Sequence, residues 1–174
     1  MRKALYFLGI LNDSDIDWLI AAGKRREIGP GINLIDEGLP IDSVFLVIEG
    51  AFSVRTAALG VREVARLLSG EVVGEMSFVD NAPPSATVCA VERSFVLAVP
   101  RRRLNAKLAE DHGFAARFYR ALSMFLADRL RATVASLGGN TPSEAHNEMD
   151  SEALDNVAVA GARFDWIQKR LRSA

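Results

Sequence analysis

One segment of the sequence has the residue types of an anion-binding turn but lacks the cation that such a site normally uses. Residues 70–92 read GEVVGEMSFVDNAPPSATVCAVE: a glycine and an acid, a short helical run, then a tight Pro-Pro-Ser-Ala-Thr bend that leads into a strand. Backbone N–H groups in such a turn can face an anion. The segment contains no lysine, arginine or histidine. Either a cation comes from elsewhere in the fold or the turn has another role.

The sequence gives no support for catalysis. It contains no Gly-x-Ser-x-Gly motif, no Walker-type loop and no histidine–cysteine pair at useful positions. His112 and His146 lie in segments that read as helix or linker, and residues 24–100 contain no histidine. We therefore predict no catalytic residue and no metal ligand, and a metal site on a cupin-like barrel is disfavoured.

Bulk properties place the chain among ordinary globular proteins. It has 174 residues, 49% hydrophobic and 25% charged, with a formal net charge of -1. This charge predicts no attraction to nucleic acid or to a membrane surface. The basic and apolar start MRKALYFLGIL superficially resembles a signal peptide, but the acidic NDSDID follows with no small-residue cleavage site. The single cysteine, Cys89, fits a small core residue, and we expect a cytoplasmic protein.

Residues 24–100 have the pattern of an all-β domain. Turn glycines recur at intervals of 9, 12, 10 and 10 residues, at positions 29, 38, 50, 60 and 70. The β-rich runs between and after them are INLIDE, SVFLVIE, AFSVRTA, REVARLL, ATVCAVE and SFVLAVP. Short strands at this spacing are typical of a sandwich or barrel. We predict about eight antiparallel strands in a jelly-roll-like barrel.

Helices are predicted on both sides of this region. Residues 12–23 read as a helix that Asn12 or Asp13 can cap and that Gly23 can end in a left-handed conformation. A short helix is predicted over 101–111 and a long one over 113–137. The long helix has an apolar stripe of period 3.6, which predicts core packing and a homodimer interface. Its members are Phe114, Phe118, Leu122, Phe125, Leu126, Leu130, Val134 and Leu137.

The last part of the chain reads as a linker and a terminal helix. Residues 138–152, GGNTPSEAHNEMDSE, are polar and rich in glycine and acids. Residues 153–174 form a plausible amphipathic helix with Leu154, Val157, Phe164, Ile167 and Leu171 as candidate contacts. The sequence leaves open whether this helix packs on its own barrel or binds a protein partner. The predicted organisation is a domain at 1–137, a linker and this helix.

The order of helix, eight-stranded barrel and long helix resembles the cyclic-nucleotide-binding domain family. Residues 35–54, IDEGLPIDSVFLVIEGAFSV, are similar to the family's strand–Glu-Gly–strand run, with Gly38 and Gly50 at its turns. Residues 67–92 look like the family's phosphate-binding cassette, with a short helix inside the barrel. The resemblance covers roughly residues 5–137. It implies a cyclic-nucleotide pocket, with cyclic AMP or cyclic GMP as possible ligands.

The resemblance assigns ligand contacts residue by residue. The glycine and glutamate of the cassette are Gly74 and Glu75, followed by Met76, and the glutamate takes the ribose 2′-hydroxyl. Backbone N–H groups near the short helix and at the bend of Ser85, Ala86 and Thr87 face the phosphate. The family's arginine, which pairs with the phosphate, is replaced by Pro84.

Proline at position 84 leaves three interpretations of the pocket open. Arginine gives a phosphate two charge-assisted hydrogen bonds, whereas proline gives neither charge nor N–H. In the first, cyclic-nucleotide binding is lost or weakened. In the second, another cation reaches the phosphate position. In the third, the pocket takes a different ligand, such as a neutral one. The candidate cations are Arg55, Arg62, Arg66 and Arg93.

Simpler roles exist for several of these residues. Glu75 could cap the cassette helix or pair with a neighbouring cation. The hydroxyls of Ser85 and Thr87 could satisfy nearby backbone groups. Arginines 101–103 read as a solvated basic face rather than a nucleic-acid site, because no aromatic residues are interleaved with them.

The predicted function is regulatory. Only residues 138–174 follow the long helix, which is too little for a winged helix-turn-helix. We therefore expect a stand-alone regulatory or adaptor protein that acts through protein–protein contacts, with no cofactor and no nucleic acid. The alternative is a genuine cyclic-nucleotide sensor that uses another cation, and a DNA-binding regulator is disfavoured.

Overall fold

The computed structural model describes residues 6–60, 62–137 and 151–172. Its centre is the β-rich region predicted from the glycine spacing. The eight strands are β1 (Lys24–Ile28), β2 (Asn33–Ile35), β3 (Ser43–Glu49), β4 (Ala51–Thr56), β5 (Arg62–Leu68), β6 (Val72–Val73), β7 (Thr87–Ala90) and β8 (Ser94–Pro100). A single 3-10 turn, η1 (Ala57–Leu59), joins β4 to β5.

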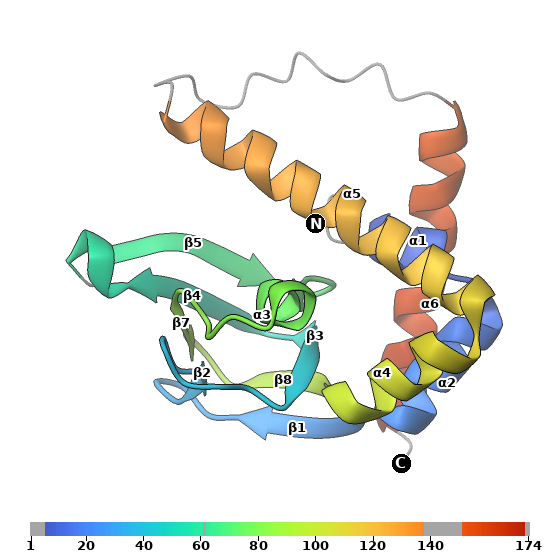
Figure 1. The fold of residues 1–174 in the computed structure, drawn as a ribbon, viewed down its shortest axis with the longest axis horizontal. Coiled ribbons are helices and arrows are strands. Elements are labelled where there is room, and N and C mark those ends of the chain that lie inside the picture. Colours follow the sequence, from blue (N-terminus) through green and yellow to red (C-terminus); the bar gives the residue numbers. More distant parts are fainter. Residues whose placement is uncertain (1–5, 61, 138–150, 173–174) are drawn as a thin grey trace.

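The strands form two antiparallel four-stranded sheets that make a β-roll (Figure 1). The strand order is β1-β8-β3-β6 in one sheet and β2-β7-β4-β5 in the other. Side chains from both sheets, among them Phe45, Val96, Phe52 and Val88, share one buried cluster between the sheets. The predicted fold class is confirmed, although β1 and β6 were not among the strand-like runs of the sequence.

Helices cover the outer face of the first sheet (Figure 1). They are α1 (Tyr6–Ile10), α2 (Asp13–Ala22), α4 (Arg101–Glu110), α5 (His112–Leu137) and α6 (Ser151–Arg172), while α3 (Glu75–Asp80) belongs to the roll. Alternate β3 side chains, such as Val44 and Leu46, contact this helical layer, whereas Phe45 and Val47 face the roll interior. The strand is therefore apolar on both faces because both faces are buried.

Helix α2 begins as the sequence predicts but ends differently. The Asn12 side chain accepts a hydrogen bond from the Asp15 N–H, and the Asp15 carboxylate accepts one from the Asn12 N–H. Gly23 is extended, with φ -85°, so the predicted left-handed end is wrong. A Cβ at this position would lie 2.5 Å from the Leu97 side chain. Glycine is therefore needed because the end of α2 packs closely against β8.

The apolar stripe of α5 divides into a buried and an exposed half. Phe114, Phe118, Leu122 and Phe125 are buried, and Phe118 makes edge contacts with Phe7 and Phe78. Farther along the helix, Leu130 is 65% exposed and Val134 is 60% exposed. The Leu137 side chain lies outside the described residues.

Helix α6 packs against the helical layer of its own chain. Phe164, Ile167 and Leu171 are buried, and the Gln168 side-chain amide donates to the Ile48 carbonyl at 2.9 Å. Arg163 pairs with Asp13 at the start of α2. The helix begins at Ser151, two residues inside the predicted linker. The rest of that linker, 138–150, and the side chains of residues 154 and 157 lie outside the described part of the chain.

The N-terminal segment is part of this layer. Phe7 and Leu8 of α1 are buried against α5 and α6. Among the helices that the structure describes, none is long and apolar enough to cross a membrane.

Candidate functional site

The segment with the anion-site pattern folds as a short helix that enters the roll. Gly74 precedes α3 in the left-handed conformation, with φ +82°. A Cβ at Gly74 would lie 2.7 Å from Ile41 Cδ1, so both the backbone angle and the packing favour glycine. The helix therefore begins at Glu75 with its side chain turned inward, where it is buried.

The end of α3 is held by the first arginine of the 101–103 run. Arg101 donates to the Ser77 carbonyl at 2.8 Å and to the Asn81 side-chain oxygen at 2.7 Å. Its other nitrogen donates to the Ile41 carbonyl at 3.2 Å. A cation at a helix C-terminus satisfies carbonyls that have no partner within the helix. Arg101 is the first residue of α4, so its hydrogen bonds connect the start of α4 to the cassette.

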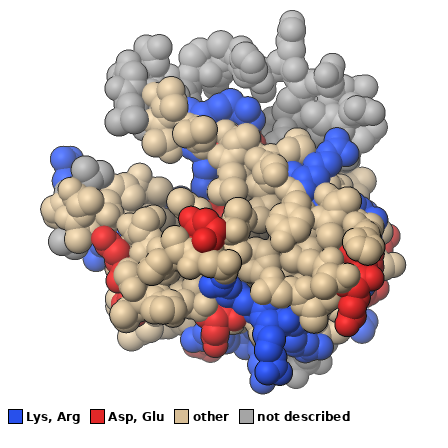
Figure 2. Space-filling view, viewed as in Figure 1, with Lys and Arg blue, Asp and Glu red and all other residues tan. Residues whose placement is uncertain are grey.

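Arg103 has the same role at the end of α2, where it donates to the Ala22 carbonyl at 3.0 Å. Two of the three arginines therefore bind backbone carbonyls, and only Arg102 fits the predicted solvated face. Basic side chains do gather over β1 and α4 at the bottom of Figure 2. Since β1 is an edge strand, exposed lysine and arginine there protect its free edge from pairing with another chain.

The bend after α3 is fixed by the neighbouring Glu-Gly loop. The Gly38 N–H donates to the Pro84 carbonyl at 2.8 Å, and the Glu37 N–H donates to the Thr87 hydroxyl at 3.1 Å. The Thr87 hydroxyl therefore accepts a hydrogen bond from the backbone of the Glu37–Gly38 loop, which is far away in the sequence. The two motifs that carried the resemblance are in direct contact.

A cavity of about 640 Å³ lies between the cassette, the second sheet and α5. Six predicted site residues line it: Gly74, Glu75, Met76, Pro84, Ser85 and Ala86. Thr87 is not among the described lining residues. The cavity volume lies within the range of small-molecule sites.

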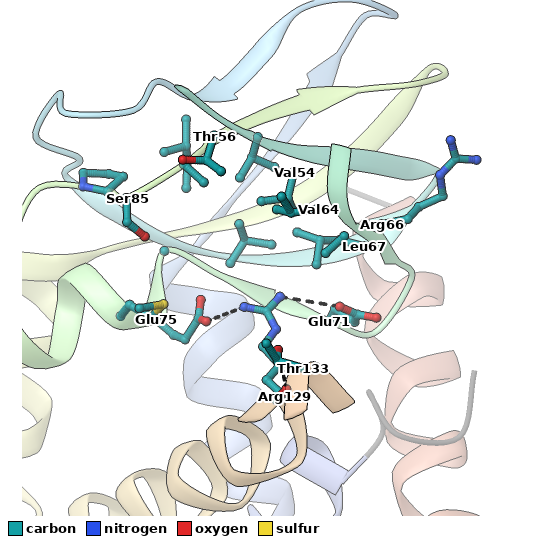
Figure 3. Close-up of a pocket in the computed structure, with 18 of the residues that line it drawn as sticks. Val54, Thr56, Val64, Arg66, Leu67, Glu71, Glu75, Ser85, Arg129 and Thr133 are labelled. Atoms are coloured by element: carbon teal, nitrogen blue, oxygen red, sulfur yellow. Dashed lines mark hydrogen bonds and ion pairs between the residues drawn. The ribbon is translucent and has the colours of Figure 1, made fainter. Parts of the chain in front are cut away.

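The polar centre of the cavity is an arginine that the sequence reasoning missed. Arg129 of α5 lies between two glutamates, as Figure 3 shows. Its Nη1 donates to Glu75 Oε1 at 2.5 Å, and its Nη2 lies 3.6 Å from Glu71 Oε2. Its guanidinium also lies over the Phe125 ring, 4.7 Å from the centroid. The cassette glutamate therefore pairs with a cation, one of the simpler roles considered for it.

Burial perturbs both carboxylates. Burial raises the pKa of Glu75 above its ordinary value, and the Arg129 charge and hydrogen bond oppose this rise. Burial likewise raises the pKa of Glu71, again opposed by Arg129. The Arg129 guanidinium therefore favours the ionised form of both carboxylates, whereas burial favours the protonated form.

Among the described residues, Arg129 pairs with Glu75, and none of the four candidate cations does. Arg66 lines the cavity, but its side chain points away from Glu75 in Figure 3 and pairs with Glu63 at 3.3 Å. Arg93 pairs with Glu27 at 2.6 Å beside β1. Arg55 and Arg62 are exposed at the far end of the β4–β5 hairpin and are not among the described lining residues. Arg129 is 54 residues from Glu75 and has no local sequence signal that marks it as a pocket residue.

Comparisons with known proteins agree with this architecture. The sequence profile of the cyclic nucleotide-binding domain matches residues 25–111, half of the chain. The chain is also 33% identical over 98 residues to the cAMP-dependent protein kinase regulatory subunit of Mycosarcoma maydis. That match covers 51% of this chain and 19% of the relative, so the chain matches only about a fifth of the relative's length.

Two solved structures are similar in fold. A cyclic nucleotide-binding domain from Methylobacillus flagellatus has a TM-score of 0.72 at 21% identity, covering 82% of this chain and 84% of that chain. The catabolite activator protein of Thermus thermophilus has a TM-score of 0.62 at 24% identity, covering 94% and 84%. At these identities the likeness establishes the fold alone. With the profile match, it follows that this chain belongs to the cyclic nucleotide-binding domain family, whose domains are regulatory and typically non-catalytic.

Proposed function

We propose that this protein is a regulatory module that acts through protein–protein contacts in the cytoplasm and has lost or weakened cyclic-nucleotide binding. One observation carries the proposal: Glu75, the expected ribose ligand, is ion-paired to Arg129 at 2.5 Å. The expected phosphate-binding arginine position holds Pro84.

The charge arrangement disfavours a tightly bound cyclic phosphate. A hydrogen-bonded ionic partner contributes about 2–5 kcal/mol, so its loss weakens affinity by roughly 30- to 4,000-fold. Arg129 cannot replace it freely, because the same guanidinium also holds Glu75 and Glu71. Turning Arg129 toward a phosphate would leave the buried Glu75 and the half-buried Glu71 without their partner.

The second candidate function is a cyclic-nucleotide sensor in which Arg129 meets the phosphate. Arg129 lies in the cavity and contacts Glu75, which favours it over the four cations predicted from the sequence. In this case nucleotide would release α5 from Glu71 and Glu75, so binding would move the helix. Arg129→Gln would then abolish nucleotide binding.

Protein contacts are assigned to the exposed half of α5. Leu130 and Val134 lie on one side of the helix and expose apolar surface that a second copy of the chain would bury. We propose a homodimer through residues 113–137. In α6 the apolar residues Phe164, Ile167 and Leu171 are already buried, so a partner would contact its outer face.

Calorimetric titration with cyclic AMP and cyclic GMP tests the proposal. The wild type and Pro84→Arg are compared, with Pro83→Arg as a control that adds the same charge one residue away. We expect heat of binding from Pro84→Arg only. Binding by the wild type at micromolar concentration would refute the proposal, and loss of that binding in Arg129→Gln would establish the second candidate.

A further inference from the structure

The charges that line the cavity are already matched within the chain. The described charged lining residues and their partners are Arg129 with Glu71 and Glu75, Arg66 with Glu63, and Asp128 with Arg131. A bound ion would therefore have to compete with an existing pair, whichever sign its charge has. The competition is strongest at Glu75, whose side chain is only 3% exposed.

The remaining surface of the cavity is mostly apolar. Val54, Val64, Leu67, Val73, Val88 and Phe125 line it, from four strands and α5. Hydroxyl groups of Thr56 and Ser85 lie at its edge (Figure 3). Apolar walls with a few polar groups are typical of small-molecule sites. Because the charged lining residues are already paired, this lining favours an uncharged ligand.

Glu75 sets the polar requirement for such a ligand. Its Oε1 accepts the bond from Arg129, and a carboxylate has about four acceptor positions on its two oxygens. An ionised carboxylate only accepts hydrogen bonds, so a ligand that reaches it must donate one. Donation to a carboxylate is charge-assisted and therefore stronger than a neutral hydrogen bond.

We propose that the cavity binds an uncharged, largely apolar small molecule that donates a hydrogen bond to Glu75. This inference rests on the proposed function, because it requires that an anionic nucleotide does not occupy the same space. The Arg129–Glu75 pair stays intact in the bound state, and the ligand fills the apolar volume beside it.

Two fluorescent probes of nearly the same shape test the charge requirement. N-phenylnaphthylamine is uncharged and has one N–H donor, while anilinonaphthalene sulfonate is the same framework with an added anionic group. Both become brighter in apolar surroundings. We expect saturable binding of the uncharged probe, one per chain, at an affinity at least about tenfold above that of the sulfonate.

Neighbouring residues on β4 provide matched variants. Val54 faces the cavity, whereas Arg55 is exposed and is not among the described lining residues. Val54→Trp should fill the cavity and weaken probe binding at least about tenfold, while Arg55→Trp should leave it unchanged. A urea unfolding curve of each variant confirms that both are folded.

The outcomes separate this inference from the proposed function. Equal or tighter binding of the sulfonate, or equal binding by Val54→Trp and wild type, would overturn the inference. If the uncharged probe does not bind and cyclic AMP gives no heat of binding, the inference is overturned but the proposed function is not. Displacement of the probe by micromolar cyclic AMP would overturn both.

Discussion

Replacing Arg129 by glutamine should destabilise the protein by removing the cation that the buried Glu75 and the half-buried Glu71 share. Arg129 lies 2.5 Å from Glu75 and 3.6 Å from Glu71, and the Glu75 side chain is 3% exposed. Glutamine keeps a hydrogen-bond donor but has no charge. Glu75 would then be ionised in the interior without a counter-charge, or would take up a proton.

The size of the effect follows from the burial of each partner. Breaking a fully buried ion pair costs about 3–5 kcal/mol, whereas exposed pairs contribute about 0–1 kcal/mol. The Arg129 side chain is 34% exposed, so solvent partly screens its charge. We therefore expect a loss of about 2–3 kcal/mol in unfolding free energy near neutral pH.

The loss of unfolding free energy in Arg129→Gln should grow as pH rises. The folded-state pKa of Glu75 is raised, so the folded protein holds this proton more tightly than the unfolded chain does. The stabilisation that this proton gives the folded state is fully present below the ordinary carboxyl pKa. It disappears as pH rises through the raised folded-state pKa of Glu75. Removing Arg129 raises the folded-state pKa further, so the deficit of the variant is larger at about pH 8 than at about pH 5.

Urea unfolding of wild type, Arg129→Gln and Arg131→Gln at both pH values measures this effect at a fixed protein concentration. Arg131 is the matched control, since it lies on the same helix and pairs with Asp128 at the surface. We expect the control to change stability by less than about 0.5 kcal/mol. A cost of Arg129→Gln no larger than that of the control, or one that shrinks as pH rises, would refute the account of the pair.

Three further predictions concern the cassette and the long helix. Arg101→Gln removes the cation at the end of α3 and should speed hydrogen exchange there, whereas Arg102→Gln, exposed on the same helix, should not. Unchanged α3 exchange in Arg101→Gln would contradict this. Gly74→Ala should cost about 2 kcal/mol or more in thermal unfolding, because φ is +82° and the added Cβ meets Ile41. Leu130→Glu should shift the chain toward monomer in sedimentation without loss of thermal stability per chain, and an unchanged mass would argue against the α5 interface.

The local patterns of the sequence predicted most of the fold. The glycine spacing and the β-rich runs predicted the eight-stranded roll, and Asn12 was correctly named as a candidate cap for the helix that begins at Asp13. Strands β1 and β6 were not predicted, for two different reasons. Four of the five β1 residues, Lys24–Ile28, are exposed and charged, and β6 has only two residues, so neither has a recognisable period.

The polar centre of the site could not be predicted in the same way. The sequence indicated the cassette and the missing arginine at position 84, but it did not indicate which way α5 lies over the roll. Arg129 is one of several arginines on that helix, and only the tertiary packing brings it to Glu75. The role of Arg101 was hidden for the same reason, because its carbonyl partners lie in α3 and in the loop before β3.

The stability of the wild type in the presence of cyclic AMP tests the central claim most directly. A ligand that binds only the folded state raises the unfolding free energy, by about 2.7 kcal/mol when its concentration is about 100 times Kd. At about 1 mM cyclic AMP, a Kd of about 10 µM would therefore give this full gain. We predict a change smaller than about 0.5 kcal/mol, corresponding to a Kd above about 1 mM. A gain near 2.7 kcal/mol would contradict the account and identify the protein as a cyclic-nucleotide sensor.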